Sequence, residues 1–179
     1  MERRGAVEMR AAAGNRLEGY AATFNSMSSD LGGFTEVIRP GAFARSLAAR
    51  PDVLALFDHD SRHVLGRTRA GTLHLEEDAK GLRFAIDVPQ TSTGKDLLVS
   101  VGRGDISGAS FAFIAKEDRW IQGNSGMLRE LLDVDLLDVT VTANPAYPET
   151  EVARRALEQA GKPFRAVLLQ RYLDTMEAC

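Results

Sequence analysis

The stretch that decides the fold is SGASFAFIAKEDRWIQGNSGMLRELLDVDLLDVTVT, residues 107–142. Its two ends, Ser107–Ala115 and Met127–Thr142, are dominated by apolar and β-branched residues, a composition that favours strands. Between them, Trp120 is followed by Gln122–Gly126, where Gly, Asn and Ser are concentrated as in turns. The stretch therefore predicts two strands separated by a turn.

Shorter strand patterns recur on its N-terminal side. They are Gly5–Phe24, expected as a hairpin with a turn at Gly14-Asn15, then Phe34–Ile38, Val53–Phe57, Thr72–Leu75 and Leu82–Val88. Two helices are also expected, over Ala42–Ala49 and after Thr91, the second with Leu97, Leu98 and Val101 on one face. We therefore expect a β-rich α+β fold: a closed or partly closed, mainly antiparallel β-barrel with a few peripheral helices.

The length and composition favour one principal domain. The chain has 179 residues, of which 44% are hydrophobic, enough for a single core. We expect the β-barrel domain to cover residues 1–150. Helical spacing in Glu149–Gln159 and Pro163–Met176, interrupted at Gly161–Pro163, predicts that residues 151–179 form a helical flank or a removable tail.

Charge and hydropathy limit the expected partners. The net charge is −3, and the arginines are spread along the sequence instead of forming a basic cluster. Nucleic acid is therefore not expected as a partner. No apolar run approaches the roughly 18 residues that span a bilayer, and Met1–Gly5 begins no secretion signal, so we expect a cytoplasmic protein away from membranes. Cys179 is the only cysteine, so no intramolecular disulfide can form.

Three histidines are candidates for a general base, because the imidazole titrates near neutral pH. His59 directly follows the apolar segment Val53–Phe57, where an anchored backbone can present a side chain to a cleft. His63 is expected in a polar turn, and His74 alternates with apolar neighbours and is expected to point outward. His59 is the best placed, although a lone histidine is also commonly structural or solvated.

Ser110 is a candidate nucleophile, because the small residues Gly108, Ala109 and Ala112 surround it and leave room for a substrate carbonyl. The pattern resembles a G-x-S-x-G nucleophile elbow with Ala112 in the last place, but that elbow requires a helix after the serine. Here the following residues predict a strand. From the local pattern alone, a strand with a small face packed against a helix is the favoured interpretation.

Asp138 interrupts an otherwise apolar or β-branched run within Leu136–Pro145. A buried carboxylate is costly unless another group pairs with it, and an imidazolium is a suitable partner. The alternative is that Asp138 faces solvent on one side of a strand, as expected for Asp133 and Asp135. Taken by itself, the pattern favours that alternative.

Taken in order, five stretches of the chain resemble the maturation proteases of tailed-phage proheads, a family related in fold to the assemblins, the capsid proteases of herpesviruses. The stretches are Gly19–Asn25, Ile38–Phe43, Phe57–Asp60 with Leu65–Thr68, Ser107–Phe113 and Leu137–Pro148. The resemblance extends from about Leu17 to Thr150.

The resemblance implies a serine endopeptidase without metal or cofactor, with His59, Ser110 and Asp138 as its catalytic residues. Its substrates would be scaffold segments or the N-terminal extension of the major capsid protein precursor, and it would also cleave itself, inside the prohead in the host cytoplasm. Analogy with the assemblins implies a homodimer or higher homo-oligomer. Assemblins use a second histidine as third member, which His63 and His74 fit poorly since both precede the serine.

Two competing interpretations remain at this level. The first is a catalytically inactive β-rich protein of the virion or scaffold, and Ala112, where the family commonly has Gly, would narrow the cleft. The second treats Leu65–Gly71 as a phosphate-binding loop, but it lacks the Lys-Ser/Thr pair of such loops.

Overall fold

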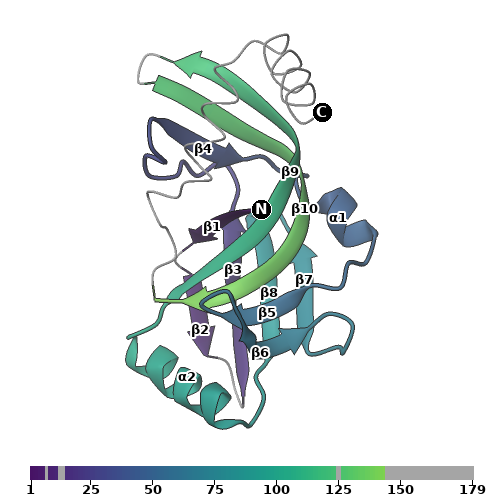
Figure 1. Cartoon of the computed structure of the whole chain (residues 1–179), viewed down its shortest axis with the longest axis vertical. Helices are drawn as coiled ribbons and strands as arrows, with labels where there is room; N and C mark the ends of the chain where they lie inside the picture. The colour runs from purple at the N-terminus through teal and green to yellow at the C-terminus, as the bar shows by residue number, and fades with distance from the viewer. Residues whose placement is uncertain (7, 12–14, 124–125, 144–179) are drawn as a thin grey trace, which may run out of the picture.

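The structure is a computed structural model that describes residues 1–6, 8–11, 15–123 and 126–143. Two helices and ten strands follow one another along this part of the chain (Figure 1). In chain order they are β1 (Glu2–Ala6), β2 (Glu8–Ala11), β3 (Arg16–Thr23), β4 (Phe34–Ile38), α1 (Ala44–Ala48), β5 (Leu54–Phe57), β6 (Asp60–Arg67), β7 (Leu73–Glu77), β8 (Gly81–Asp87), α2 (Ser92–Arg103), β9 (Gly108–Gly123) and β10 (Gly126–Thr142).

The strands form two sheets. The six-stranded sheet is built around the long antiparallel pair β9 and β10, with β1 on the outer edge of β9. The other edge of β10 is shared: its first part pairs with β4 and its last part with β5, both in parallel, and β6 lies beyond β5. The four-stranded sheet is antiparallel throughout, in the order β2-β3-β8-β7.

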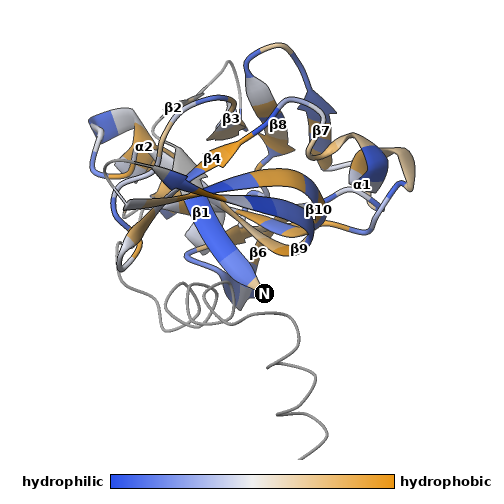
Figure 2. Cartoon of the chain, turned by 90° about the horizontal axis from the view of Figure 1, so that it is seen from above, coloured by the Kyte–Doolittle hydropathy of each residue, from blue (hydrophilic) through white to orange (hydrophobic). Residues whose placement is uncertain are grey.

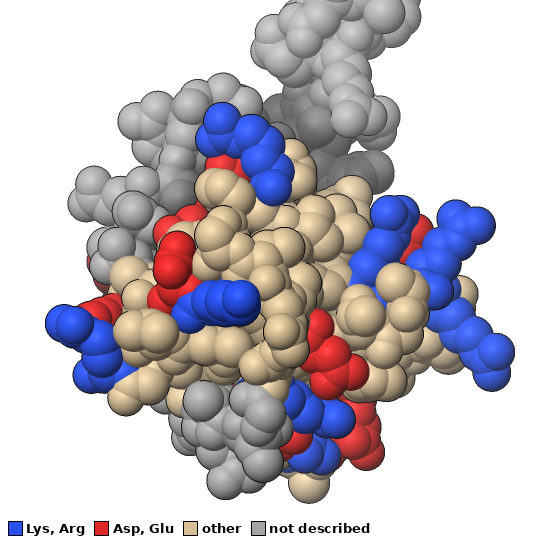
Figure 3. All heavy atoms as spheres, turned by 90° about the horizontal axis from the view of Figure 1, so that it is seen from below, with Lys and Arg blue, Asp and Glu red and all other residues tan. Residues whose placement is uncertain are grey.

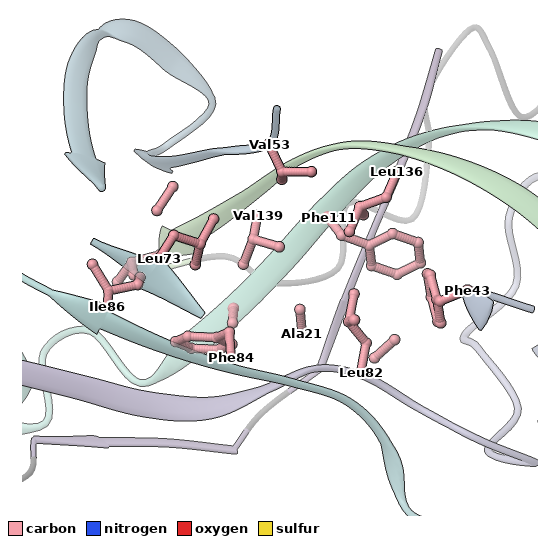
Figure 4. Packing of buried hydrophobic residues seen from close by; sticks show 14 of the residues in the cluster. Ala21, Phe43, Val53, Leu73, Leu82, Phe84, Ile86, Phe111, Leu136 and Val139 are labelled. Carbon is pink, nitrogen blue, oxygen red and sulfur yellow. The ribbon is translucent and has the colours of Figure 1, made fainter. Parts of the chain in front are cut away.

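The pair β9 and β10 curls across the face of the four-stranded sheet (Figure 1). Register shifts between Leu131 and Val134, and between Leu136 and Asp138, mark irregularities of the kind that bend and twist a strand. Residues on the two inner faces meet in one core, with Phe111 and Val139 of the curled sheet facing Phe84 of β8 (Figure 4). All three are fully buried, and burying a phenylalanine contributes roughly 1.5–3 kcal/mol.

The helices lie at the periphery. Thr91 caps the first turn of α2 by accepting the Gly94 amide at 3.2 Å, and Gly104 ends the helix with a φ of 83°. Leu97 and Val101 are buried, which confirms the predicted apolar face. None of the described helices is long and apolar enough to cross a membrane.

Polar residues gather on the outer surfaces. In the view from above, the apolar residues lie largely along the strands, whereas β1 is mostly hydrophilic (Figure 2). On the face seen from below, acidic and basic side chains lie near one another around the rim (Figure 3). Ion pairs between partly exposed side chains include Arg45 with Asp133 and Arg67 with Asp52.

The prediction of a β-rich fold with few helices is confirmed, and the curled sheet forms half a barrel. No backbone ladder joins the two sheets within the described ranges, so a closed barrel is not confirmed. The fold is mainly antiparallel, but the two parallel pairings of β10 were not predicted. They arise because β4 and β5 reach β10 through long connections, which allow strands to run in the same direction.

The structure also corrects two local predictions. His63 was expected in a turn, but it lies on β6, whose residues 61–64 are exposed, so the strand carries no alternating apolar signal. Strand β9 continues past Trp120 to Gly123 instead of ending near Ala115. The predicted flank or tail at 151–179 lies outside the described residues.

Candidate active site

His59 lies in a tight turn at the edge of the curled sheet. Phe57 pairs with Asp60, so Asp58 and His59 are the two loop residues of the β5–β6 hairpin. Their φ angles are 49° and 55°, the positive values that a type I′ turn requires. Asn and Gly are the usual residues at such positions, and a histidine there costs of order 1–3 kcal/mol unless its surroundings stabilise it.

Hydrogen bonds from β10 provide that stabilisation. The backbone N–H of His59 donates to Oγ1 of Thr140 at 2.8 Å, and the N–H of Asp58 donates to the carbonyl of Val141 at 3.0 Å. Thr140 is fully buried, and its hydroxyl donates to the carbonyl of Leu56 at 3.0 Å. The threonine therefore ties the turn and the end of β5 to the central strand.

The same strand pair places the other two candidates. Ser110 of β9 is directly opposite Thr140 of β10, and Asp138 precedes Thr140 by two residues. Because side chains alternate along a strand, all three lie on one face of the sheet. Ser110 and Asp138 are 5% and 8% exposed, so neither is an ordinary solvated surface group.

His59 bridges these two residues. Its Nδ1 lies 2.7 Å from Oδ1 of Asp138, and its Nε2 lies 3.1 Å from Oγ of Ser110. An ionised carboxylate only accepts hydrogen bonds, so Nδ1 carries the proton that is donated to Asp138. In the neutral imidazole Nε2 is then free to accept the proton of Ser110, as a general base must.

Ser110 has a second acceptor that the sequence did not indicate. Its hydroxyl donates to the carbonyl oxygen of Arg4 at 2.5 Å. Arg4 belongs to β1, which lies along β9 with Gly5 opposite Ser110. Since the hydroxyl has one proton, this contact competes with the hydrogen bond to His59.

The other predicted candidates lie elsewhere. His63 is on β6, with its Nδ1 3.7 Å from Asp60, and His74 is exposed on β7. Neither hydrogen-bonds Ser110 or Asp138 among the described residues. The phosphate-loop interpretation of Leu65–Gly71 is wrong, because the segment leads from β6 to β7 rather than to a helix, and Arg67 is bound to Asp52.

Ala112 lies beside the candidate site without filling it. It is fully buried on β9 and directly opposite Asp138. The methyl group therefore lies next to the carboxylate rather than between Ser110 and His59. No group of three His, Cys, Asp or Glu side chains in the part of the chain that is described is arranged to hold a metal.

A serine hydroxyl, a histidine and an aspartate connected in this order is the arrangement that serine hydrolases use. Residues 5–163 match the family model of the caudovirus prohead serine proteases, and the chain belongs to this family. The prohead protease of Enterobacteria phage HK97 is 30% identical over 139 residues, which are 76% of this chain and 58% of that relative. The chain thus spans less than two thirds of the relative's length, and no solved structure gives a significant match. The resemblance seen in the sequence is confirmed.

Proposed function

We propose that this protein is a serine endopeptidase that acts on phage prohead proteins, with Ser110 as nucleophile, His59 as general base and Asp138 as the residue that orients the imidazole. The observation that carries the proposal is the bridging position of His59, 2.7 Å from Asp138 and 3.1 Å from Ser110. Membership of the prohead serine protease family supports the same reaction class.

In the proposed reaction, Oγ of Ser110 attacks a peptide carbonyl carbon while its proton moves to Nε2 of His59. The tetrahedral intermediate collapses when the C–N bond breaks, and the leaving amine takes the proton from His59. Water then hydrolyses the acyl-enzyme with the same histidine as base, and we expect backbone N–H groups to bind the oxyanion. Asp138 stabilises the imidazolium that forms in each step.

The proposed substrates are the major capsid protein precursor, through its N-terminal extension, and the scaffold segments, with self-cleavage as a further reaction. Similarity to the prohead protease of phage HK97 supports this assignment. The place of action would be the prohead inside the host cell. By analogy with the assemblins we also propose a related barrel fold and a homodimer or higher homo-oligomer.

The test is co-production of the chain with the capsid protein precursor of the same phage. We expect trimmed capsid protein with the wild type and full-length precursor with Ser110→Ala, because the nucleophile is absent. Normal trimming by that variant would disprove the assignment. Labelling of Ser110 by a serine-directed phosphonate would separate an active enzyme from the inactive virion protein considered above.

A further inference from the structure

Strand β1 occupies the edge of β9 beside Ser110. It runs antiparallel to β9, with Arg4 opposite Phe111 and Gly5 opposite Ser110. Figure 1 shows it as a short strand on the outer side of β9, and Figure 2 shows that it is mostly hydrophilic. An extended peptide that adds to a sheet edge is a recurring form of peptide recognition, so β1 has the geometry of a bound peptide.

The backbone of β1 also has a specific position relative to the nucleophile. The carbonyl oxygen of Arg4 accepts a hydrogen bond from Oγ of Ser110 at 2.5 Å. In a peptide substrate, the residue whose carbonyl lies at the nucleophile is the one before the scissile bond. Arg4 therefore holds the place of that residue. The hydroxyl donates to the oxygen instead of attacking the carbon, so the contact is not reactive.

The side chain of Arg4 enters a built site. Its Nε and Nη2 lie 2.5 Å and 3.1 Å from the two carboxylate oxygens of Glu36 on β4. Its guanidinium lies 5.7 Å from the ring centroid of Phe113. A two-point contact with a carboxylate, together with an aromatic face, is the geometry that recognises a guanidinium.

The charges around Glu36 would still favour a bound cation if β1 were absent. Glu36 is 2% exposed, and the remaining charges of the cluster are Arg129, 3% exposed, and Asp118. Strand β1 also contributes Glu2, whose carboxylate binds both Arg129 and Arg4. With both β1 side chains set aside, one cation faces two carboxylates, so a cation is favoured at the place of Arg4. A protein that leaves a buried carboxylate without one of its partners is strongly destabilised. Burial raises the pKa of Glu36, which Arg4 and Arg129 oppose.

There is also room beside this contact. A pocket of about 230 Å³ is lined by Arg4, Glu36, Phe111, Thr23 and Met27, among other residues. Arg4 therefore leaves this pocket partly empty. The pocket can accommodate substrates that carry other side chains next to the basic residue.

We propose that peptide substrates bind as a strand on β9 in the place of β1, with a lysine or arginine before the scissile bond whose side chain binds Glu36. The proposal rests on the proposed function and names the substrate class of the same site. In the resting chain, β1 occupies this site in cis and draws the proton of Ser110 away from His59. Glu36 is thus a specificity-determining residue, and Arg4 is the side chain that a substrate must displace.

The same ion pair would also serve a purely structural role, in which Arg4 fastens the N-terminal strand. That role does not require the Arg4 carbonyl to lie at Ser110, and it predicts no dependence of cleavage on the substrate residue. Substrate preference therefore separates the two roles.

The first experiment uses internally quenched peptides with the sequence of residues 1–8, carrying Arg, Lys, Gln, Leu or Glu at the place of Arg4. For the full chain we expect kcat/KM at least about tenfold higher with Arg or Lys than with Gln, the size of effect expected for a charge-assisted pair. In Glu36→Gln this ratio should fall toward one. Ser110-dependent cleavage without preference for basic residues would overturn the proposal, as would an unchanged ratio in Glu36→Gln.

The second experiment tests the occupant and leaves the buried Glu36 intact, in case its variant does not fold. Arg4→Gln should lower KM for the arginine peptide several-fold, because the competing side chain is gone. Arg103→Gln is the control: it lies at the end of α2 and not on β1, its side chain is 70% exposed, and it changes the net charge equally. Equal KM values for the two variants would overturn cis occupancy.

Failure of this proposal differs from failure of the proposed function. If the capsid precursor is trimmed in a Ser110-dependent way but after neutral or acidic residues, the enzyme assignment stands and the role of Glu36 is wrong. If neither peptides nor precursor are cleaved in a Ser110-dependent way, both proposals are wrong.

Discussion

The hydroxyl of Thr140 accepts the backbone N–H of His59 at 2.8 Å and donates to the carbonyl of Leu56 at 3.0 Å. A buried residue of the central strand thus fixes a turn that would otherwise be strained by two consecutive positive φ angles. Thr140 touches no reacting atom, so its proposed role is to position the general base.

Replacing Thr140 with Val should therefore reduce kcat while changing KM little. Loss of one buried hydrogen bond costs about 1 kcal/mol, which corresponds to roughly a fivefold loss of rate when that bond positions the general base. Steady-state kinetics on a peptide substrate provide the measurement. Thr140→Ser keeps the hydroxyl and should recover most of the rate; equal losses in both variants would argue for packing alone.

Asp138→Asn should abolish most of the activity at neutral pH. An amide in this place favours the wrong imidazole tautomer, which costs on the order of 10⁴ in kcat in a well-studied Ser-His-Asp triad. The control is Asp135→Asn on the same strand, whose partners Arg45 and Lys116 lie at the surface. That variant should keep its rate. A nearly unchanged rate in Asp138→Asn would move the third catalytic role to another residue.

We expect ionisation of Glu130 to make part of the free energy of unfolding depend on pH. Its carboxylate accepts from Nε of Arg39 at 3.0 Å and of Arg119 at 2.7 Å, and these hydrogen bonds lower the pKa of Glu130 below its ordinary value of 4.5. A lowered pKa means that the stabilisation is complete above about 4.5 and disappears as the pH falls through the pKa in the folded protein.

The measurement is the urea midpoint of the wild type and Glu130→Gln between pH 7 and pH 3. We expect the variant to be less stable at pH 7 and the difference to shrink as the carboxylate of the wild type becomes protonated. A difference that stays constant over this range would show that the charge of Glu130 does not contribute.

Two glycines should respond to alanine in opposite directions. A Cβ at Gly81 on β8 would lie 2.0 Å from the carbonyl oxygen of Ala22 on the neighbouring strand, so Gly81→Ala should cost roughly 2–4 kcal/mol of unfolding free energy. Gly102 in α2 has open space around it, and Gly102→Ala should add about 0.5–1 kcal/mol through helix propensity. Thermal or urea unfolding of both variants checks the pair.

The sequence predicts most strands of this fold, because their apolar patterns are local. β10 is a clear case, since apolar and β-branched residues make up most of its sequence. β6 could not be found in this way, because residues 61–64 face solvent and its pairing with β5 depends on the turn at Asp58-His59. The parallel partners of β10 were also unpredictable, because register between distant strands is not encoded in either strand alone.

The residues of the candidate site were likewise only partly predictable from the sequence. Local chemistry left Ser110 as a strand residue with small neighbours, and it is indeed nearly buried; only its distance to His59 distinguishes it. Thr140 carried no signal, because a threonine in a β-branched run is ordinary strand composition. The contact between Arg4 and Ser110 spans 106 positions, and nothing in either local sequence indicates it.

Strand β10 carries β4 and β5 on the same edge, but an irregularity between Leu131 and Val134 separates the two pairings. A residue inserted or deleted there would shift the first part of β10 relative to β9, together with β4 and Glu36, while leaving Asp138 opposite Leu54 of β5. A change in the length of β10 could therefore alter which peptides bind while the catalytic residues stay in place. The irregularity thus separates the part of β10 that positions Glu36 from the part that carries Asp138.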